Sequence, residues 1–252
     1  MPTHPPSLIE PDALRLSLDQ LFKIAWPKLA EDGAICVGLS IDWLHAPALR
    51  ALALRHTHAE EHARAARFLR AEDGLRHLAG RMLLRSLAAH YGGFAADQPM
   101  PKNAWGKPEP APHLSCNLSH SGNQVWAALS HLPHLGIDVE SASAPQDYGD
   151  ILRSFHPDEI AALEGMADAP AAMMRCWTRK EAVAKAVGMG LSLPLHEYAV
   201  DCGATAAGWL RVAPRSLRHT AWSTIDLPLD QAYVGALAVA ATCSHVMVLK
   251  YF

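Results

Sequence analysis

Hydrophobic residues form two kinds of pattern along this chain, and the two kinds alternate. Short apolar or β-branched runs predict strands at 34–43, 124–129 and 136–140, with more after residue 195. Between these runs, hydrophobic residues recur every three or four positions, which is typical of helices with one buried face. The order strand, helices, strands, helices, strands predicts an α+β fold of two similar α+β lobes packed as an intramolecular pseudo-dimer.

Helix signals divide the longer segments. Residues 46–91 are expected to be helical in two or three pieces, the last of which ends at Gly92-Gly93. Thr57 is a candidate cap for one piece, because Glu60 follows it at capping-box spacing. Pro157 and Pro170 each suit the first turn of a helix, so two further helices are expected to begin there.

The remaining pattern sets the expected domain limits. We expect a loose tail over 1–12, because residues 1–11 hold four prolines, then an N-terminal lobe over 13–132 and a C-terminal lobe over 133–252. The strands expected in the last part of the chain are 198–201, 210–212, 221–225, 233–240 and 246–251.

Composition narrows the class of protein. With 252 residues, 50% hydrophobic and 19% charged, the chain can bury a sizeable core. Its net charge of −3 gives no indication of the positively charged surface that binds nucleic acid. No stretch reaches the ~18 apolar residues of a membrane span, and we see no signal peptide. The five cysteines never occur in C-x-x-C spacing, which argues against structural zinc or a disulfide framework and fits a reducing cytosol.

Two stretches carry the candidate chemistry. In Gly136–Glu140 (GIDVE), Asp138 and Glu140 are two residues apart, so both side chains leave the same face of a strand. In Trp177–Lys185 (WTRKEAVAK), Glu181 and Lys185 share one face of a helix, together with Trp177, which is expected in the core. We predict that Asp138, Glu140 and Glu181 hold one Mg²⁺.

A count of charges extends this prediction to phosphate. Three carboxylates and a bound pyrophosphate carry more negative charge than one divalent ion can neutralise. Lys180 and Lys185 are close enough in sequence to neutralise part of the remainder. The plainer alternative is that the two strand acids face solvent and that Glu181–Lys185 is a surface pair contributing only about 0.2–0.5 kcal/mol.

A third segment is polar. Asn117–Gly122 (NLSHSG) is expected to be a turn between two strands, whose backbone amides and imidazole could meet a phosphate. A Ser–His nucleophile pair is a competing interpretation, but no orienting acid is identifiable. A polar turn without function is the third possibility.

Taken together, these motifs resemble the 4′-phosphopantetheinyl transferases of the Sfp type. The resemblance covers about residues 60–195. The matching segments are Phe68–Arg85, Trp105–Pro108 (WGKP), Asn117–Gly122, Gly136–Glu140, Trp177–Lys185 and Gly188–Leu191 (GMGL).

The resemblance implies an enzyme that moves the 4′-phosphopantetheine arm of coenzyme A to a serine of an apo acyl or peptidyl carrier protein, releasing 3′,5′-ADP. It implies a Mg²⁺-dependent, cytoplasmic, monomeric protein that contacts neither nucleic acid nor membrane. Coenzyme A is then expected in the cleft between the two lobes. Which carrier or pathway is served cannot be derived from the sequence.

The resemblance also assigns roles in the second half of the chain. Asp138, Glu140 and Glu181 correspond to metal ligands, and Asp138 also lies beside coenzyme A. Glu181 is the candidate base, directly or through a metal-bound water, and Lys185 is the second candidate catalytic residue. Lys180 and Lys185 are expected to meet the phosphates or the pantetheine arm.

In the first half of the chain the resemblance assigns coenzyme A contacts. Those expected at the 3′-phosphate, other phosphates or the adenine are Arg64, Arg76, Lys107, Pro108, Ser119 and His120. Glu61 is a departure, because it stands near a position where the family often has a basic phosphate contact.

Two rival functions stay open at this point. A Mg²⁺-dependent phosphohydrolase acting on a nucleotide or on coenzyme A would use a similar set of acids and lysines. It would release product without any carrier protein. A noncatalytic module that binds coenzyme A or a carrier would bind its ligand without transferring any group.

Overall fold

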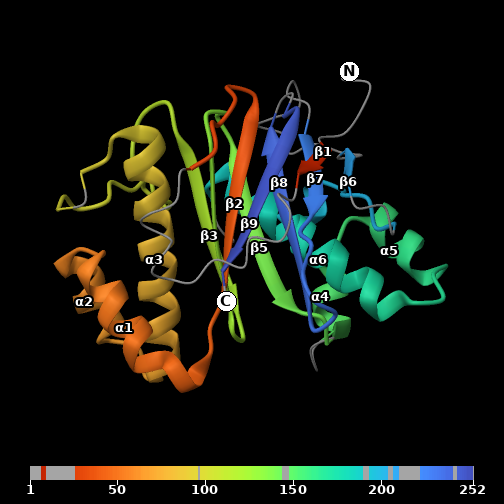
Figure 1. Cartoon of the computed structure of the whole chain (residues 1–252). Coiled ribbons are helices and arrows are strands. Elements are labelled where there is room, and N and C mark those ends of the chain that lie inside the picture. The colour runs from red at the N-terminus through yellow and green to blue at the C-terminus, as the bar shows by residue number, and fades with distance from the viewer. Residues whose placement is uncertain are drawn as a thin grey trace. The chain divides into compact units, whose positions relative to one another are not determined.

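Two β-sheets with flanking helices make up the computed structural model of the chain (Figure 1). The structure describes residues 7–9, 26–95, 97–143, 148–189, 193–203, 207–209, 222–240 and 243–251. One unit runs from Leu8 to Pro133 and takes in the segment from His245 onward, and the other is built on His134–Ser244. The fold is therefore α+β, as the sequence predicts.

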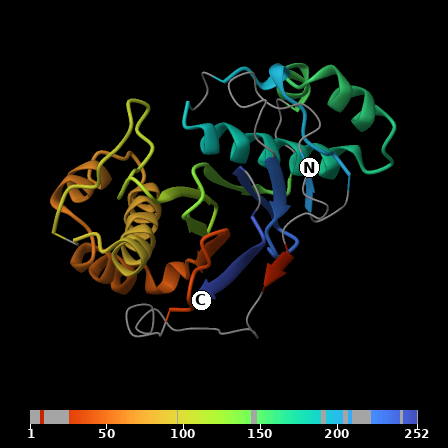
Figure 2. The same ribbon diagram turned by 90° about the horizontal axis from the view of Figure 1, so that it is seen from above.

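The first unit contains a five-stranded sheet in the order β1-β9-β2-β4-β3. Strand β2 pairs in parallel with β9 and antiparallel with β4, which also pairs with β3. Three helices gather on one face of this sheet, with α3 against β3 and β4 (Figures 1 and 2). The elements are β1 (Ser7–Ile9), β2 (Gly33–Ser40), α1 (Ala46–Arg55), α2 (Ala59–Ala65), α3 (Ala71–Gly92), β3 (Ser115–Ser121), β4 (Gln124–Ser130) and β9 (His245–Tyr251).

The second unit contains a four-stranded antiparallel sheet in the order β5-β8-β7-β6. Its long helix α6 packs along β5 and β8, and α5 packs against α6 (Figures 1 and 2). The elements are β5 (Leu135–Ser141), α4 (Tyr148–Arg153), α5 (Pro157–Glu164), α6 (Ala169–Val187), β6 (Ala207–Trp209), β7 (Trp222–Asp226) and β8 (Tyr233–Ala240).

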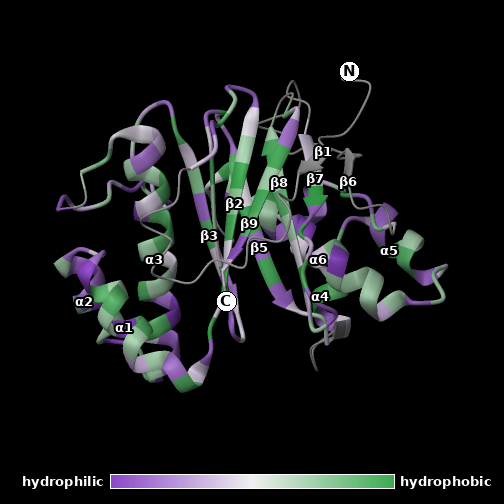
Figure 3. Cartoon of the chain, in the orientation of Figure 1, coloured by the Kyte–Doolittle hydropathy of each residue, from purple (hydrophilic) through white to green (hydrophobic). Residues whose placement is uncertain are grey.

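Each unit has its own hydrophobic core between helix and sheet. In the first unit, Leu78, Met82 and Leu83 of α3 are fully buried with residues of β2 and β4. In the second, Met173 and Val183 of α6 are buried beside the sheet residues of β8. Figure 3 shows hydrophobic residues along β2, β9 and β8, and hydrophilic residues over most of α2. That each unit follows a strand–helices–strands order is consistent with two similar lobes, and their similarity stays a prediction.

Local signals placed most of the elements correctly. The expected strand 233–240 coincides with β8, and α5 and α6 begin with Pro157 and Pro170 in their first turns. Helix α6 ends at Gly188, whose φ of 80° suits glycine. Trp177 is partly buried and stacks on Phe155 with ring centroids 6.3 Å apart.

Other local predictions need correction. The cap of α2 is His58, not Thr57, and Glu61 completes its capping box. Residues 198–201 contain a single β-bridge residue, Ala199, rather than a strand. The expected strand 210–212, and residues 1–6 and 10–12 of the expected tail, lie outside the described residues.

The last strand of the chain departs from the expected domain limits. We placed all residues from 133 onward in the C-terminal lobe, but β9 pairs with β2 in the sheet of the first unit. Residues 7–9 of the expected tail form β1 in the same sheet. These pairings join segments more than 200 positions apart, and no local pattern specifies them.

The helices offer no candidate for crossing a membrane. Over the part of the chain that the structure describes, none is both long enough and apolar enough to do so.

Candidate active site

Gly136 of β5 allows helix α6 to approach this strand very closely. A Cβ added at Gly136 would lie 2.1 Å from the carbonyl oxygen of Ala182 and 2.3 Å from the backbone nitrogen of Ala186. Because residues two apart on a strand share a face, Asp138 and Glu140 follow Gly136 on the side that meets α6. The glycine thus sets the strand acids against the helix.

Asp138 is bonded to Lys185 across this contact. The Lys185 ammonium donates to Oδ1 of Asp138 at 2.6 Å. The Asp138 side chain is 3% exposed, whereas that of Lys185 is 29% exposed. Lys185 is therefore in contact with solvent, whereas the carboxylate that it binds is buried.

Glu181 lies in the same cluster of charges. The pKa of Glu181 is raised to about 6, mainly by burial and also by the nearby carboxylate of Asp138, while Lys185 opposes the shift. Glu140 also contributes to raising this pKa, so all three acids act on one another. Oε1 of Glu181 is buried and accepts no hydrogen bond from the described residues.

This donor set fits a hard divalent cation. Asp138, Glu140 and Glu181 offer only oxygen ligands, which are the ligands that Mg²⁺ prefers. A cation beside Glu181 would favour its charged form and so oppose the effect of burial on its pKa. Asp138 and Glu140 both act electrostatically on Glu181, so the three predicted ligands are near enough to interact, and their role as metal ligands remains a proposal.

Lys180 does not belong to this cluster, which corrects our expectation that it meets a phosphate. Its side chain is fully buried, and its ammonium donates to Oε2 of Glu159 at 2.6 Å and to the carbonyl of Tyr198 at 2.8 Å. The ammonium also lies 4.3 Å from the centroid of the Tyr198 ring. Lys180 ties α6 to α5 and to the segment before β6, so we no longer propose it as a coenzyme A contact.

Arg76 and His120 lie together in the first unit. Arg76 donates to the carbonyl of Gly122 at 2.7 Å and to Asp73 at 2.5 Å. The side-chain hydrogen bond from Arg76 is the main cause of the lowered pKa of Asp73, and the charge of His120 contributes to it. Arg76 is therefore fixed beside the end of β3.

Ser119 and His120 sit on β3 itself, which corrects the expected turn at Ser-His-Ser-Gly. The turn falls at Gly122, whose φ is 56°. Ser119 is buried and His120 is exposed, because neighbouring residues on a strand point to opposite faces. This geometry disfavours a Ser–His nucleophile pair and leaves His120 accessible to a ligand.

Lys107 and Pro108 come from a turn that Asn103 organises. The side-chain oxygen of Asn103 accepts from the backbone N–H of Trp105 and of Lys107, each at 2.9 Å. Burial lowers the pKa of Lys107 to about 8, and Pro108 is buried with its carbonyl accepting from the thiol of Cys116 at 3.4 Å. An anion bound next to this partly desolvated ammonium would strongly stabilise its charged form.

Arg76, His120 and Lys107 form a basic region of the first unit. Two residues of α3 that the sequence analysis did not single out also belong to it. Nη1 of Arg81 and Nε2 of His77 are buried and make no hydrogen bond within the described residues. Burial lowers the pKa of His77 to about 4, and the charges of Arg81 and Arg64 add to the effect. The i,i+4 spacing of two polar residues in a buried helix face was the signal that could have indicated them.

Glu61 offsets part of the positive charge of this region, because its carboxylate favours the charged forms of Arg81 and His77. Its Oε2 accepts from Arg85 at 2.7 Å and from the backbone N–H of His58 at 2.9 Å. The Glu61 carboxylate is therefore committed to its partner Arg85 and to capping α2. Arg64 and Arg81 contribute positive charge beside it.

Sequence comparisons agree with the motif analysis. The profile of the 4′-phosphopantetheinyl transferase superfamily matches residues 134–238, a range that holds β5 and α6. The 4′-phosphopantetheinyl transferase HetI of Nostoc sp. is 34% identical over 191 residues, which cover 72% of this chain and 78% of that protein.

Two further relatives match shorter parts. A 4′-phosphopantetheinyl transferase of Bacillus subtilis is 34% identical over 56% of this chain and 65% of its own length. The L-aminoadipate-semialdehyde dehydrogenase-phosphopantetheinyl transferase of Rattus norvegicus is 28% identical over 63% of this chain and 57% of its own length. With the motifs and fold described above, these similarities show that the chain belongs to the 4′-phosphopantetheinyl transferase superfamily.

Proposed function

We propose that this protein transfers the 4′-phosphopantetheine group of coenzyme A to a serine of an apo carrier protein. The observation that supports the proposal is the electrostatic effect of Asp138 and Glu140 on Glu181, beside the ion pair of Lys185 with Asp138 where α6 packs on β5. Members of the superfamily share this activity, and a cluster of carboxylates and a lysine is the chemistry that a metal-bound diphosphate requires.

In this proposal Asp138, Glu140 and Glu181 would hold Mg²⁺ together with the diphosphate of coenzyme A. Mg²⁺, when bound, would neutralise the charge that develops on the bridging oxygen as its bond to the phosphorus that bears the pantetheine arm breaks. Lys185 turns from Asp138 toward a phosphate oxygen, a movement that its partial exposure permits. With a cation beside it Glu181 would be ionised, and an ionised carboxylate in this position can accept the serine proton.

The chemical step is a single displacement. The serine oxygen of the carrier attacks the phosphorus that bears the pantetheine arm, and 3′,5′-ADP leaves. Glu181 takes the serine proton, directly or through a water molecule. The role of the protein is to position both reactants and to supply the acceptor for that proton.

The first unit supplies the contacts to the nucleotide end in this proposal. Arg76 and His120 lie together at the end of β3. Lys107 contributes an ammonium whose pKa is lowered by burial. We add Arg81 to the contacts expected from the sequence, because its buried Nη1 has no acceptor among the described residues. A phosphate would provide that acceptor and would offset the desolvation of the guanidinium.

The deciding experiment incubates the full chain with coenzyme A, Mg²⁺ and a panel of apo carrier proteins. We expect at least one carrier to gain the mass of the phosphopantetheinyl group, with 3′,5′-ADP released in equal amount. Release of 3′,5′-ADP at the same rate without a carrier would instead indicate a phosphohydrolase. Binding of coenzyme A without either product would indicate a binding module.

Glu181→Gln tests the residue assignment in the same assay. The amide keeps the shape of the side chain but can neither accept the serine proton nor offer a charge to Mg²⁺. We expect the rate to fall at least about 100-fold, the lower range for loss of a general base. Glu164→Gln, at an exposed position on α5, is the matched control and should leave the rate unchanged. Full activity of Glu181→Gln would remove Glu181 from the mechanism.

A further inference from the structure

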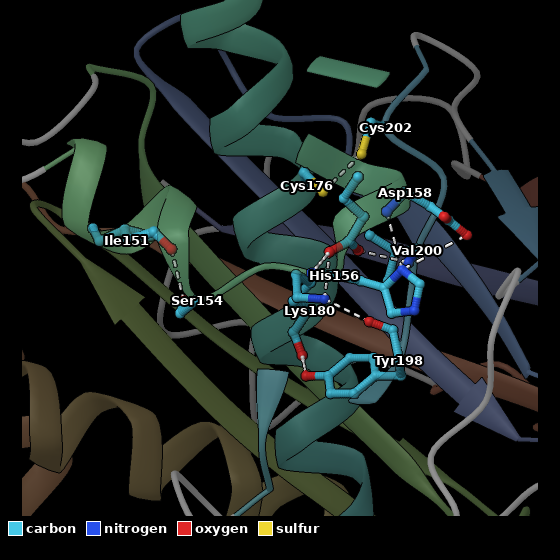
Figure 4. A network of polar contacts seen from close by, with 10 residues as sticks. Ile151, Ser154, His156, Asp158, Cys176, Lys180, Tyr198, Val200 and Cys202 are labelled. Carbon is cyan, nitrogen blue, oxygen red and sulfur yellow. Dashed lines mark hydrogen bonds and ion pairs between the residues drawn. The ribbon is translucent and has the colours of Figure 1, made fainter. Parts of the chain in front are cut away.

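Cys176 and Cys202 meet in the interior of the second unit. Their sulfur atoms are 2.9 Å apart, although the residues are separated by 26 positions in the sequence. Cys176 lies on α6 and is fully buried, and Cys202 lies in the segment before β6 and is 3% exposed. Figure 4 shows the two thiols facing each other above the network formed by Lys180 and Tyr198.

The backbone on both sides of Cys202 is fixed to α6. Nη1 of Arg179 donates to the carbonyl of Asp201 at 2.5 Å and to that of Gly203 at 3.0 Å. Arg179 is held in turn by two hydrogen bonds to Asp226, at 2.8 and 2.6 Å. Because Arg179 is three residues after Cys176 on the same helix, the two sulfurs are positioned by one rigid arrangement.

A second set of contacts holds the same segment from the other side. Oε1 of Glu159 accepts from the backbone N–H of Val200 at 2.8 Å. Lys180 donates to the carbonyl of Tyr198 at 2.8 Å (Figure 4). The segment from Tyr198 to Gly203 is thus bonded to α5 and α6 at residues spaced along its length. The contact between the sulfurs is part of this packing and does not depend on a loose loop.

The carboxylate of Glu159 also lies close to both sulfurs, which raises the possibility of a metal site. Two thiolates bound to one tetrahedral zinc ion, with Zn–S bonds of about 2.3 Å, are roughly 3.8 Å apart, which is wider than the separation found here. Both oxygens of Glu159 are already bonded, one of them to the Lys180 ammonium at 2.6 Å. A divalent cation would have to enter beside a buried positive charge, so the geometry disfavours a metal.

We propose that Cys176 and Cys202 form an oxidation site that closes to a disulfide with a two-electron oxidant of the peroxide class. An S–S bond of about 2.05 Å requires the sulfurs to approach by less than 1 Å. The thiolate of Cys202, the more exposed of the two, attacks a peroxide oxygen, and the O–O bond breaks to give a sulfenic acid and hydroxide. The thiol of Cys176 then displaces this oxygen as water, and a thiol reductant reverses the reaction.

Closure would join α6 to the segment before β6. The loop that it closes contains Glu181 and Lys185, and a cross-link of this length stabilises a fold mainly by restricting the unfolded chain. We expect the oxidised protein to unfold at a temperature several degrees higher than the reduced protein. Because both thiols are buried, oxidation requires a local opening of the segment and will be slow compared with that of an exposed thiol.

The test treats the full-length folded protein with hydrogen peroxide, then unfolds it and alkylates the remaining thiols. We expect the five alkylated cysteines of the reduced protein to fall to three, with a peptide that links Cys176 to Cys202 and with full recovery after dithiothreitol. Cys243→Ser, which changes another buried cysteine, should still lose two thiols. Cys202→Ala should lose none to a disulfide.

Several results would overturn the proposal. One is a treated wild-type protein that keeps five alkylatable thiols under conditions that oxidise a small free thiol. Others are a linked peptide that joins a different pair of cysteines, or a disulfide that still forms in Cys202→Ala. Peptide mapping of the wild-type protein decides the matter even if a variant fails to fold.

Discussion

Nζ of Lys185 lies 2.6 Å from Oδ1 of Asp138, so the cation of α6 and the buried acid of β5 form one ion pair. The pair is unequal, because the lysine is partly exposed and the aspartate is not. In the proposed function Lys185 exchanges Asp138 for a phosphate of coenzyme A. The ion pair is then the form that the site takes before its ligands arrive.

Replacing Lys185 should therefore affect binding more than turnover. Lys185→Met removes a cation that meets the diphosphate, and hydrogen bonds to charged groups contribute about 1.5–3 kcal/mol. We expect the KM for coenzyme A to rise roughly 10-fold or more, since about 1.4 kcal/mol corresponds to tenfold, with a smaller change in kcat. Steady-state kinetics against a fixed carrier measure both constants, and Lys28→Met, at an exposed position, is the control. An unchanged KM would exclude Lys185 from coenzyme A binding.

Gly136→Ala should disrupt the site through the backbone. The new methyl group would overlap backbone atoms of Ala182 and Ala186, which cannot rotate away, so α6 must shift from β5. Overpacking of this kind costs about 1–3 kcal/mol, and we expect a loss of that size in the free energy of unfolding together with a marked fall in transfer rate. Gly165→Ala is the control, because its Cβ would meet the nearest atom at 3.7 Å. Equal denaturation midpoints for the two variants would contradict the argument.

Local patterns in the sequence were sufficient for much of this arrangement. The alternation around Asp138 and the helical spacing of Glu181 and Lys185 predicted which side chains share a face, and the structure brings these three together. Proline and glycine positions located the ends of α6 because their backbone preferences act within one or two residues.

Contacts between distant segments could not be predicted in this way. Lys180 and Glu181 are neighbours in one charged motif, but the partner of Lys180 is Glu159, which is 21 residues away. Which of two adjacent charged residues is buried depends on packing against α5, and the motif does not contain that information. The same limit explains why the pairing of β9 with β2 and the contact of Cys176 with Cys202 were not expected.

Lys180→Met should lower stability without changing the affinity for coenzyme A. Removing one partner of a buried ion pair leaves the other charge uncompensated, at a cost of about 3–5 kcal/mol. We expect a loss of this order for Lys180→Met in chemical denaturation, because Glu159 would be left buried without its cationic partner. Lys102→Met, at an exposed position, should change little. If the folded fraction of Lys180→Met showed a large rise in KM for coenzyme A, Lys180 would return to the candidate site.

His77 should make the first unit sensitive to acid. Burial lowers the folded-state pKa of His77 from 6.5 to about 4, and Arg81 and Arg64 act in the same direction. Between these two pH values the unfolded chain binds a proton that the folded chain does not, so stability is present above about pH 6.5 and is lost as the pH falls toward 4. Glu61 opposes this shift, whereas the charge of His120 adds to it.

His77→Gln removes this titration, and we expect its free energy of unfolding to depend less steeply on pH over that window. Denaturant titrations at several pH values from 7.5 to 4.5 (roughly the window that the linkage relation defines) measure the slope. His196→Gln, at an exposed position on a 3₁₀ helix, should keep the slope of the wild type. Identical slopes for all three proteins would show that His77 titrates alike in the folded and unfolded states.

Arg81 should recognise a phosphate of coenzyme A, and the 3′-phosphate can be tested separately from the diphosphate. 3′-Dephospho-coenzyme A lacks only that group, so the ratio of kcat/KM for coenzyme A over the dephospho form reports its contribution. If the buried Nη1 of Arg81 meets the 3′-phosphate, Arg81→Gln should reduce this ratio about 10-fold, as expected for the loss of one charge-assisted hydrogen bond. Arg67→Gln, exposed just beyond α2, should leave the ratio unchanged. An equal loss of activity with both substrates would assign Arg81 to the diphosphate or to the fold, and no loss with either would show that its guanidinium serves neither phosphate.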